Sequence, residues 1–157
     1  MKKLNQTRLK DPFGNLTDWG SVLSLIEALD EKGELAECQP GLIRILKYKA
    51  NWRLREAVLK RIGQIENPCE DLFHQVLAIL NDDNIYFDAR ILASSALVHL
   101  LHNTHNGCHS RVTRATQKVI GRLLATPQPP CLEDALKNLG SEIGFPAVWP
   151  DLKPDQI

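Results

Sequence analysis

Hydrophobic residues recur at steps of three and four along most of the chain, which is the spacing of an amphipathic α-helix. The first such run follows Thr17 and Asp18, either of which suits a helix N-cap, and it stops at Gly33. Its apolar positions are Trp19, Val22, Leu23, Ile26 and Leu29. The pattern therefore predicts a first helix between residues 18 and 33.

Six more helices follow from the same spacing, with prolines and polar turns marking their ends. We place them near residues 40–46, 51–65, 69–80, 85–101, 112–124 and 129–143. The helix over 85–101 is apolar on a broad surface that includes Phe87, which predicts a central helix covered on more than one side. No segment alternates apolar and polar residues in the manner of a strand. The predicted fold is all-α, with about seven helices in one domain over residues 17–144.

Both ends of the chain lack this periodicity. Residues 1–16 are polar and contain turn-forming residues, so we expect a loosely held N-terminal arm. Residues 145–157 contain Pro146, Pro150 and Pro154, which exclude regular helix and predict an extended tail.

Two stretches of the chain resemble each other. In both, an apolar helix end is followed by a polar turn, then by an aromatic residue that enters the next helix, and then by an arginine. The stretches are residues 42–62, LIRILKYKANWRLREAVLKRI, and residues 76–97, VLAILNDDNIYFDARILASSAL. The two arginines, Arg55 and Arg90, are 35 positions apart. Repetition at this period is typical of helical repeats, because one helix pair cannot bury its apolar face without a neighbour.

This pattern resembles that of the HEAT and HEAT-like repeats. In the first unit it is carried by Trp52, Arg55, Ala57 and Val58, and in the second by Phe87, Arg90, Ala93 and Ala96. The resemblance implies a right-handed α-α superhelix, a HEAT-like solenoid, in which both arginines tuck inward and are structural. A third unit, residues 112–143, has Leu132 or Glu133 where the arginine would be, so we interpret it as a capping unit.

HEAT-like proteins are mainly binding scaffolds, so the resemblance implies a non-enzymatic module that binds a protein partner. Its concave surface would consist of the third, fifth and seventh helices. The chain has no GxGxxG, P-loop, GxSxG or HExxH motif. One HEAT-like enzyme class, the alkylpurine DNA glycosylases, uses aromatic residues and an acid on a basic surface, where Trp52 and Asp88 would be the counterparts. The short, neutral chain argues against that class.

Charge is balanced over the whole chain but uneven along it. The chain has 157 residues and a formal net charge of zero, so it lacks an overall attraction to nucleic acid. Residues 44–61, however, hold seven basic residues against the single acid Glu56: Arg44, Lys47, Lys49, Arg53, Arg55, Lys60 and Arg61. A second run without an acid contains Arg111, Arg114, Lys118 and Arg122.

These runs are either solvated helix faces or a binding groove. A groove would accept an acidic protein segment or, as the alternative function, a nucleic-acid backbone along residues 44–61. The candidate partner-binding residues are Arg44, Lys47, Trp52, Arg53, Lys60 and Arg61.

Histidines and a cysteine cluster near the end of the fifth helix with the spacing HxxHxxHxxCH. The candidate metal ligands are His99, His102, His105 and Cys108, with His109 beside them. His99 and His102 are three apart and share a helix face. Structural zinc sites have tighter pairs, so we favour an ordinary polar helix end and expect no cofactor.

The four cysteines lie far apart without a CxxC pair, which favours free thiols, with a disulfide as the alternative. No stretch approaches the length of an apolar membrane span. We therefore expect a cytoplasmic protein that does not contact a membrane.

Overall fold

The computed structural model describes residues 10–104 and 108–144. Within these ranges the chain forms seven α-helices and no strand, which confirms the predicted all-α class. The α-helices are α2 (Trp19–Glu31), α3 (Gln39–Lys47), α4 (Trp52–Leu59), α5 (Glu70–Asn81), α6 (Phe87–His102), α7 (His109–Leu124) and α8 (Pro130–Glu142). Two 3-10 helices lie between them, η1 (Leu35–Cys38) and η2 (Ile62–Gln64).

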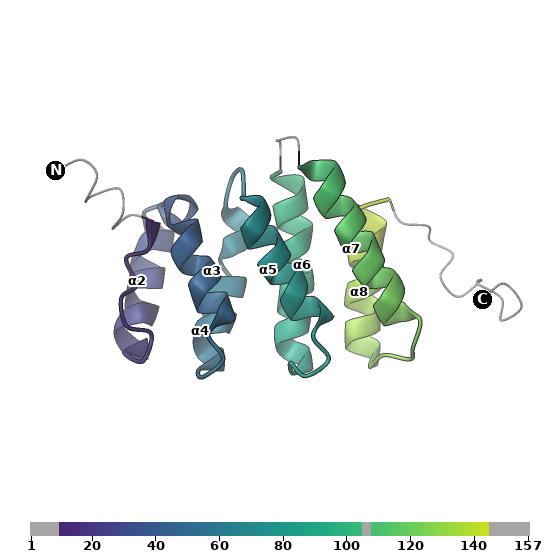
Figure 1. Ribbon diagram of the computed structural model, residues 1–157, viewed down its shortest axis with the longest axis horizontal. Helices are drawn as coiled ribbons and strands as arrows, with labels where there is room; N and C mark the ends of the chain where they lie inside the picture. The colour runs from purple at the N-terminus through teal and green to yellow at the C-terminus, as the bar shows by residue number, and fades with distance from the viewer. Residues whose placement is uncertain (1–9, 105–107, 145–157) are drawn as a thin grey trace, which may run out of the picture.

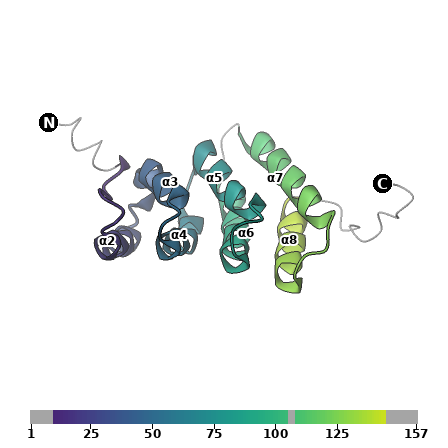
Figure 2. The same ribbon diagram turned by 60° about the horizontal axis from the view of Figure 1, so that its bottom comes forward.

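The α-helices lie in a row and form two layers (Figures 1 and 2). One layer contains α2, α4, α6 and α8, and each of these contacts the next. The other contains α3, α5 and α7, which contact one another in the same order. The pairs α3 with α4, α5 with α6 and α7 with α8 join the layers. Because each pair is antiparallel, α2, α4, α6 and α8 all begin at one edge, the lower edge of Figure 1.

The core lies between the layers, and α6 is its central helix. This helix contacts α4, η2, α5, α7 and α8, so it is covered on several sides, as its broad apolar surface predicts. Its buried residues are Ala89, Arg90, Ala93, Ser94, Ala96, Leu97, Leu100 and Leu101. Small alanine side chains on this helix allow its neighbours to approach closely.

Arg55 and Arg90 occupy equivalent positions in α4 and α6. Each is the fourth residue of its helix and is buried, with 8% of Arg55 and 2% of Arg90 exposed. Arg55 Nε donates a hydrogen bond to the Leu46 carbonyl at 3.2 Å, and Arg90 Nε donates to the Leu80 carbonyl at 2.9 Å. Both acceptors are the penultimate residue of the preceding helix, whose last carbonyls lack partners within the helix. The inward position expected for both arginines is therefore confirmed.

The helix predicted over residues 51–65 ends earlier than its apolar pattern indicates. α4 stops at Leu59, and the chain continues as η2. Asn103, just after α6, donates hydrogen bonds from Nδ2 to the carbonyls of Gly63 and Ile65 at 2.9 and 3.1 Å. His99 packs against Gly63, where an added Cβ would lie 3.0 Å from the His99 Cβ. These contacts with a distant helix hold residues 62–65 in a tighter turn than the local pattern predicts.

The described part of the N-terminal segment, residues 10–16, is not the loosely held arm that we expected over residues 1–16. Phe13 and Leu16 are buried in the core, with 5% and 6% of their surfaces exposed. Arg44 pairs with Asp11, with Nε 2.7 Å from Oδ2. This segment packs against α3 because Gly41 leaves room for the Phe13 ring, a feature that a polar composition conceals. Residues 1–9 and the predicted tail, 145–157, lie outside the described residues.

Replacing Gly41 with alanine should destabilise the protein, although alanine normally favours a helix. The added Cβ would lie 2.7 Å from two carbons of the Phe13 ring, so the ring must move. We expect the free energy of unfolding, measured by urea denaturation, to fall by about 1–3 kcal/mol. The control is Gly121→Ala in α7, where an added Cβ meets nothing within 4 Å. That substitution should raise the free energy of unfolding by about 0.5–1 kcal/mol. If both substitutions changed the free energy of unfolding in the same direction, the packing of Phe13 on Gly41 would be contradicted.

Candidate functional site

Four large hydrophobic side chains are exposed in the described chain, and all lie where helices of one layer begin. They are Trp19, Trp52, Tyr86 and Phe87, between 39 and 52% exposed. Trp19 opens α2, Trp52 opens α4, and Tyr86 and Phe87 stand at the N-cap and first position of α6. Together with Arg53 we call these residues the aromatic edge.

The repeat explains why aromatic residues gather there. Trp52 and Phe87 are the aromatic entries of the two matching stretches, and the antiparallel pairs bring both helix starts to the same edge (Figure 1). Asn51 fixes the start of α4, because its side-chain oxygen accepts a hydrogen bond from the Arg53 backbone N–H at 2.9 Å. The sequence pattern assigned Trp19 and Phe87 to buried helix faces. Their position in the first turn leaves them instead about half exposed.

Ring and cation contacts connect the aromatic edge across three helices. The rings of Trp52 and Tyr86 meet edge to face, with centroids 6.2 Å apart and planes at 81°. The Arg53 guanidinium carbon lies 5.9 Å from the Trp19 ring centroid and 5.5 Å from that of Trp52. Each distance falls within the range of a favourable interaction. The side chains from α2, α4 and α6 thus form one row.

The hydroxyl group of Tyr86 also interacts with Glu56. Partial burial raises the pKa of Tyr86 to about 12, and the negative charge of Glu56 and a hydrogen bond with it act in the same direction. The phenol therefore stays neutral at physiological pH. Because Glu56 belongs to α4, this contact ties the start of α6 to the neighbouring helix.

The six predicted partner-binding residues do not form a single patch. Trp52 and Arg53 open α4, whereas Lys60 and Arg61 follow its end, about 12 Å further along the helix axis. Arg44 and Lys47 belong to α3, in the other layer. Of this set, only Trp52 and Arg53 lie at the aromatic edge, where Trp19, Tyr86 and Phe87 join them.

Much of the basic charge in residues 44–61 is engaged with acids or carbonyls. The Arg44 guanidinium holds the pKa of Asp11 below its usual value through a hydrogen bond. Arg61 lies 3.5 Å from Asp30 and 3.8 Å from Glu27 on α2, and Arg55 is buried. These pairings favour a structural role for much of the charge over an open basic groove.

The second basic run is also partly paired. Arg111 makes two hydrogen bonds to Glu70, and Arg122 donates to the Asn81 side chain and carbonyl. Arg122 also lies 3.4 Å from Asp83. These contacts link α7 to both ends of α5 and so stabilise the layer of α3, α5 and α7.

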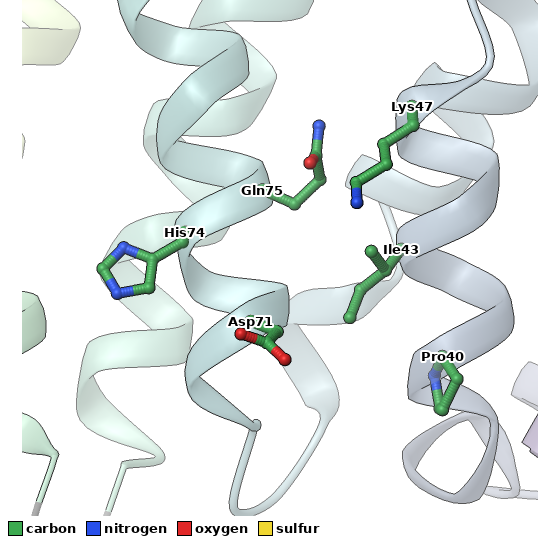
Figure 3. Close-up of a pocket in the computed structure, with 6 residues that line it drawn as sticks. All are labelled: Pro40, Ile43, Lys47, Asp71, His74 and Gln75. Atoms are coloured by element: carbon green, nitrogen blue, oxygen red, sulfur yellow. The ribbon is translucent and has the colours of Figure 1, made fainter.

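A groove of about 510 Å³ lies between α3 and α5, in the layer of α3, α5 and α7 (Figure 3). Its lining residues are Pro40, Ile43, Lys47, Asp71, His74 and Gln75. Lys47 and Gln75 extend toward the gap from opposite helices, while the His74 ring points away from α3 (Figure 3). His74 Nε2 lies 3.3 Å from Glu70 Oε1, which also binds Arg111. The groove thus offers one free amine and one carboxylate, without a convergent set of chemical groups.

The histidines proposed as metal ligands point to different neighbours. His99 packs against Gly63 in η2, while His102 Nε2 lies 3.0 Å from Glu142 Oε2 on α8. Cys108 is buried, and α7 begins at His109, inside the segment expected to be a loop. Over residues 10–104 and 108–144, no three His, Cys, Asp or Glu side chains are grouped to hold a metal ion. His105 lies outside the described residues.

The chain matches no model of a protein family, no curated protein and no solved structure. None of the helices in its described part has the length and apolar character to cross a membrane. The surface of the described chain is therefore the evidence for function, and the aromatic edge holds its exposed large hydrophobic side chains. Its sequence signal was the aromatic residue at each helix entry, directly after a polar turn.

Proposed function

We propose that this chain is a non-enzymatic protein-interaction module, an adaptor, assembly or neutralising scaffold built as a HEAT-like, right-handed helical solenoid. The equivalent bonds of Arg55 and Arg90, and the regular contacts within each layer, support the repeat. We take the layer of α4, α6 and α8 as the concave, partner-binding side. We expect it to act in the cytoplasm.

The observation that carries the proposal is the aromatic edge. Tryptophan, tyrosine and arginine dominate the residues that contribute most to protein interfaces. Trp52 is 52% exposed although its ring is large and apolar, and it lies beside Tyr86 and Arg53. Leaving these rings in water is unfavourable in the free chain, and a partner that covers them gains the free energy of their burial.

Replacing Trp52 with alanine should therefore abolish partner binding with little effect on the fold. The tagged chain and its variants would be used to capture proteins from a lysate of the source cells, with quantification by mass spectrometry. We expect a partner that the wild-type chain retains and Trp52→Ala loses by about tenfold or more, because a central interface tryptophan contributes 2 kcal/mol or more.

Lys118→Ala is the matched control for this experiment. Lys118 is exposed on α7, in the other layer, and has no ion pair among the described residues. It should retain the partner as well as the wild-type chain does. Capture that is equal in all three proteins, or no protein enriched over the tag alone, would count against the aromatic edge as a binding surface.

A further inference from the structure

Arg53 differs from most arginines of the described chain in its polar contacts. Six of the eight described arginines hydrogen-bond or pair through their side chains: Arg44, Arg55, Arg61, Arg90, Arg111 and Arg122. Arg53 and Arg114 have no such partner within the part that the structure describes. Arg53 nevertheless has a defined place, because its guanidinium lies over both Trp19 and Trp52.

An arginine held over ring faces is prepared to bind a carboxylate. The guanidinium carbon lies over both rings, and no side-chain hydrogen bond or ion pair within the described residues engages its N–H donors, so they stay available for a bidentate bond. Because the side chain is already positioned, less rotamer entropy is lost when an anion binds.

The local electrostatics also favour an anion beside Arg53. Residues 47–53 contain Lys47, Lys49 and Arg53 and no acid, and Glu56 in the next turn of α4 is engaged with Tyr86. The first turn of α4 carries no acid either, so the positive end of its dipole adds to these charges. A cation at a helix start is unfavourable in the free chain, and an incoming carboxylate removes this repulsion.

We propose that the aromatic edge binds a partner segment in which one Asp or Glu is flanked by apolar side chains. The carboxylate binds Arg53, and the apolar side chains cover Trp52 and the rings of Tyr86 and Phe87. This inference rests on the proposed function and names the chemistry of its partner.

Single-stranded nucleic acid is the main competing ligand, because bases stack on tryptophan and phosphate binds arginine. The surroundings argue against a chain of many negative charges. Asp18 precedes Trp19, Asp88 follows Phe87, and Glu56 bonds to Tyr86, so acids lie on both sides of Arg53 along the edge. A segment with one local carboxylate satisfies Arg53 without meeting these acids, whereas a polyphosphate meets them repeatedly.

The test selects peptides without assuming a partner. Random 12-residue peptides displayed on phage would be selected on the wild-type chain, and the enriched peptides synthesised and measured by fluorescence anisotropy. We expect enriched peptides to carry an Asp or Glu between apolar residues, and to bind Arg53→Ala about tenfold more weakly or worse. Replacing that acid by its amide should cause a similar loss. The matched control, Arg114→Ala, removes another unpaired arginine and should leave binding unchanged.

The outcomes separate this inference from the proposed function. Peptides that require Trp52 but bind Arg53→Ala normally, or that lack an acid, would overturn the carboxylate inference and leave the binding surface standing. A selection that yields no peptide dependent on Trp52 would overturn both. Oligothymidylate that displaces the peptides and loses affinity in Arg53→Ala would overturn the inference in favour of nucleic acid.

Discussion

Replacing Arg90 with alanine should lower the free energy of unfolding by about 3 kcal/mol, a large part of the stability of a domain of this size. Arg90 is among the largest fully buried side chains, and its Nε binds the Leu80 carbonyl at the end of α5. Alanine leaves that carbonyl without its partner and creates a cavity. The substitution also removes the bond to Asp83 and the contact with the Phe87 ring. Urea denaturation followed by circular dichroism measures the effect.

Two further variants separate the causes of this loss. Arg90→Met fills much of the volume but cannot donate to the Leu80 carbonyl, so its stability should lie between those of the wild type and Arg90→Ala. Arg114→Ala, at an exposed arginine of α7, should change stability by less than about 0.5 kcal/mol. A loss below about 1 kcal/mol in Arg90→Ala would show that this arginine does not join α5 to α6.

Replacing Phe73 with alanine should cost about 3–5 kcal/mol and leave the chain barely folded or unfolded at room temperature. Phe73 lies in α5 with 1% of its surface exposed and belongs to the core between the layers. Removing the ring forfeits its burial and leaves a cavity that backbone shifts only partly close. Thermal unfolding measured by circular dichroism would show the change as a strong decrease in Tm.

Phe87→Ala is the matched control, because the residue type and the substitution are the same. Phe87 is 46% exposed at the start of α6, so its loss should cost less than about 1 kcal/mol. We expect Phe73→Ala to lower the stability of the fold, and Phe87→Ala to weaken partner binding instead. Equal destabilisation by both substitutions would contradict the assignment of Phe87 to an exposed surface.

The helices could be predicted from the sequence because each buries apolar residues at helical spacing, as a stripe on most helices and as a broad surface on α6. The seven α-helices could be predicted on this basis. The inward arginines followed only from the resemblance to HEAT-like repeats, and η1 and η2 could not be predicted. η2 depends on Asn103, 38 residues after Ile65, which binds the carbonyls that would otherwise continue α4. The burial of Phe13 could not be predicted for a similar reason, because its place in the core depends on Gly41, in a helix that is distant in sequence.

The candidate site was predicted only in part. Trp52 and Arg53 were identified from the basic run and the repeat, but the run also contributed Arg44 and Arg61, which pair with acids elsewhere in the fold. Linear charge density does not reveal such pairing. Periodicity likewise placed Trp19 and Phe87 on buried faces, although a residue in the first turn of a helix can project beyond the layer that covers the helix. Which charged and aromatic side chains stay available for binding depends on their pairing in the folded chain, and composition alone does not show it.

The central claim is that α4 and α6 lie side by side in equivalent positions, so that their first residues form one edge. Nuclear Overhauser spectroscopy of the isotope-labelled chain tests it most directly, because Trp52 and Tyr86 are distant in sequence but adjacent in this arrangement. We predict cross-peaks between the indole protons of Trp52 and the ring protons of Tyr86, whose centroids lie 6.2 Å apart. Assigned spectra in which these rings show no mutual cross-peak would contradict the side-by-side repeats, and with them the proposed binding surface.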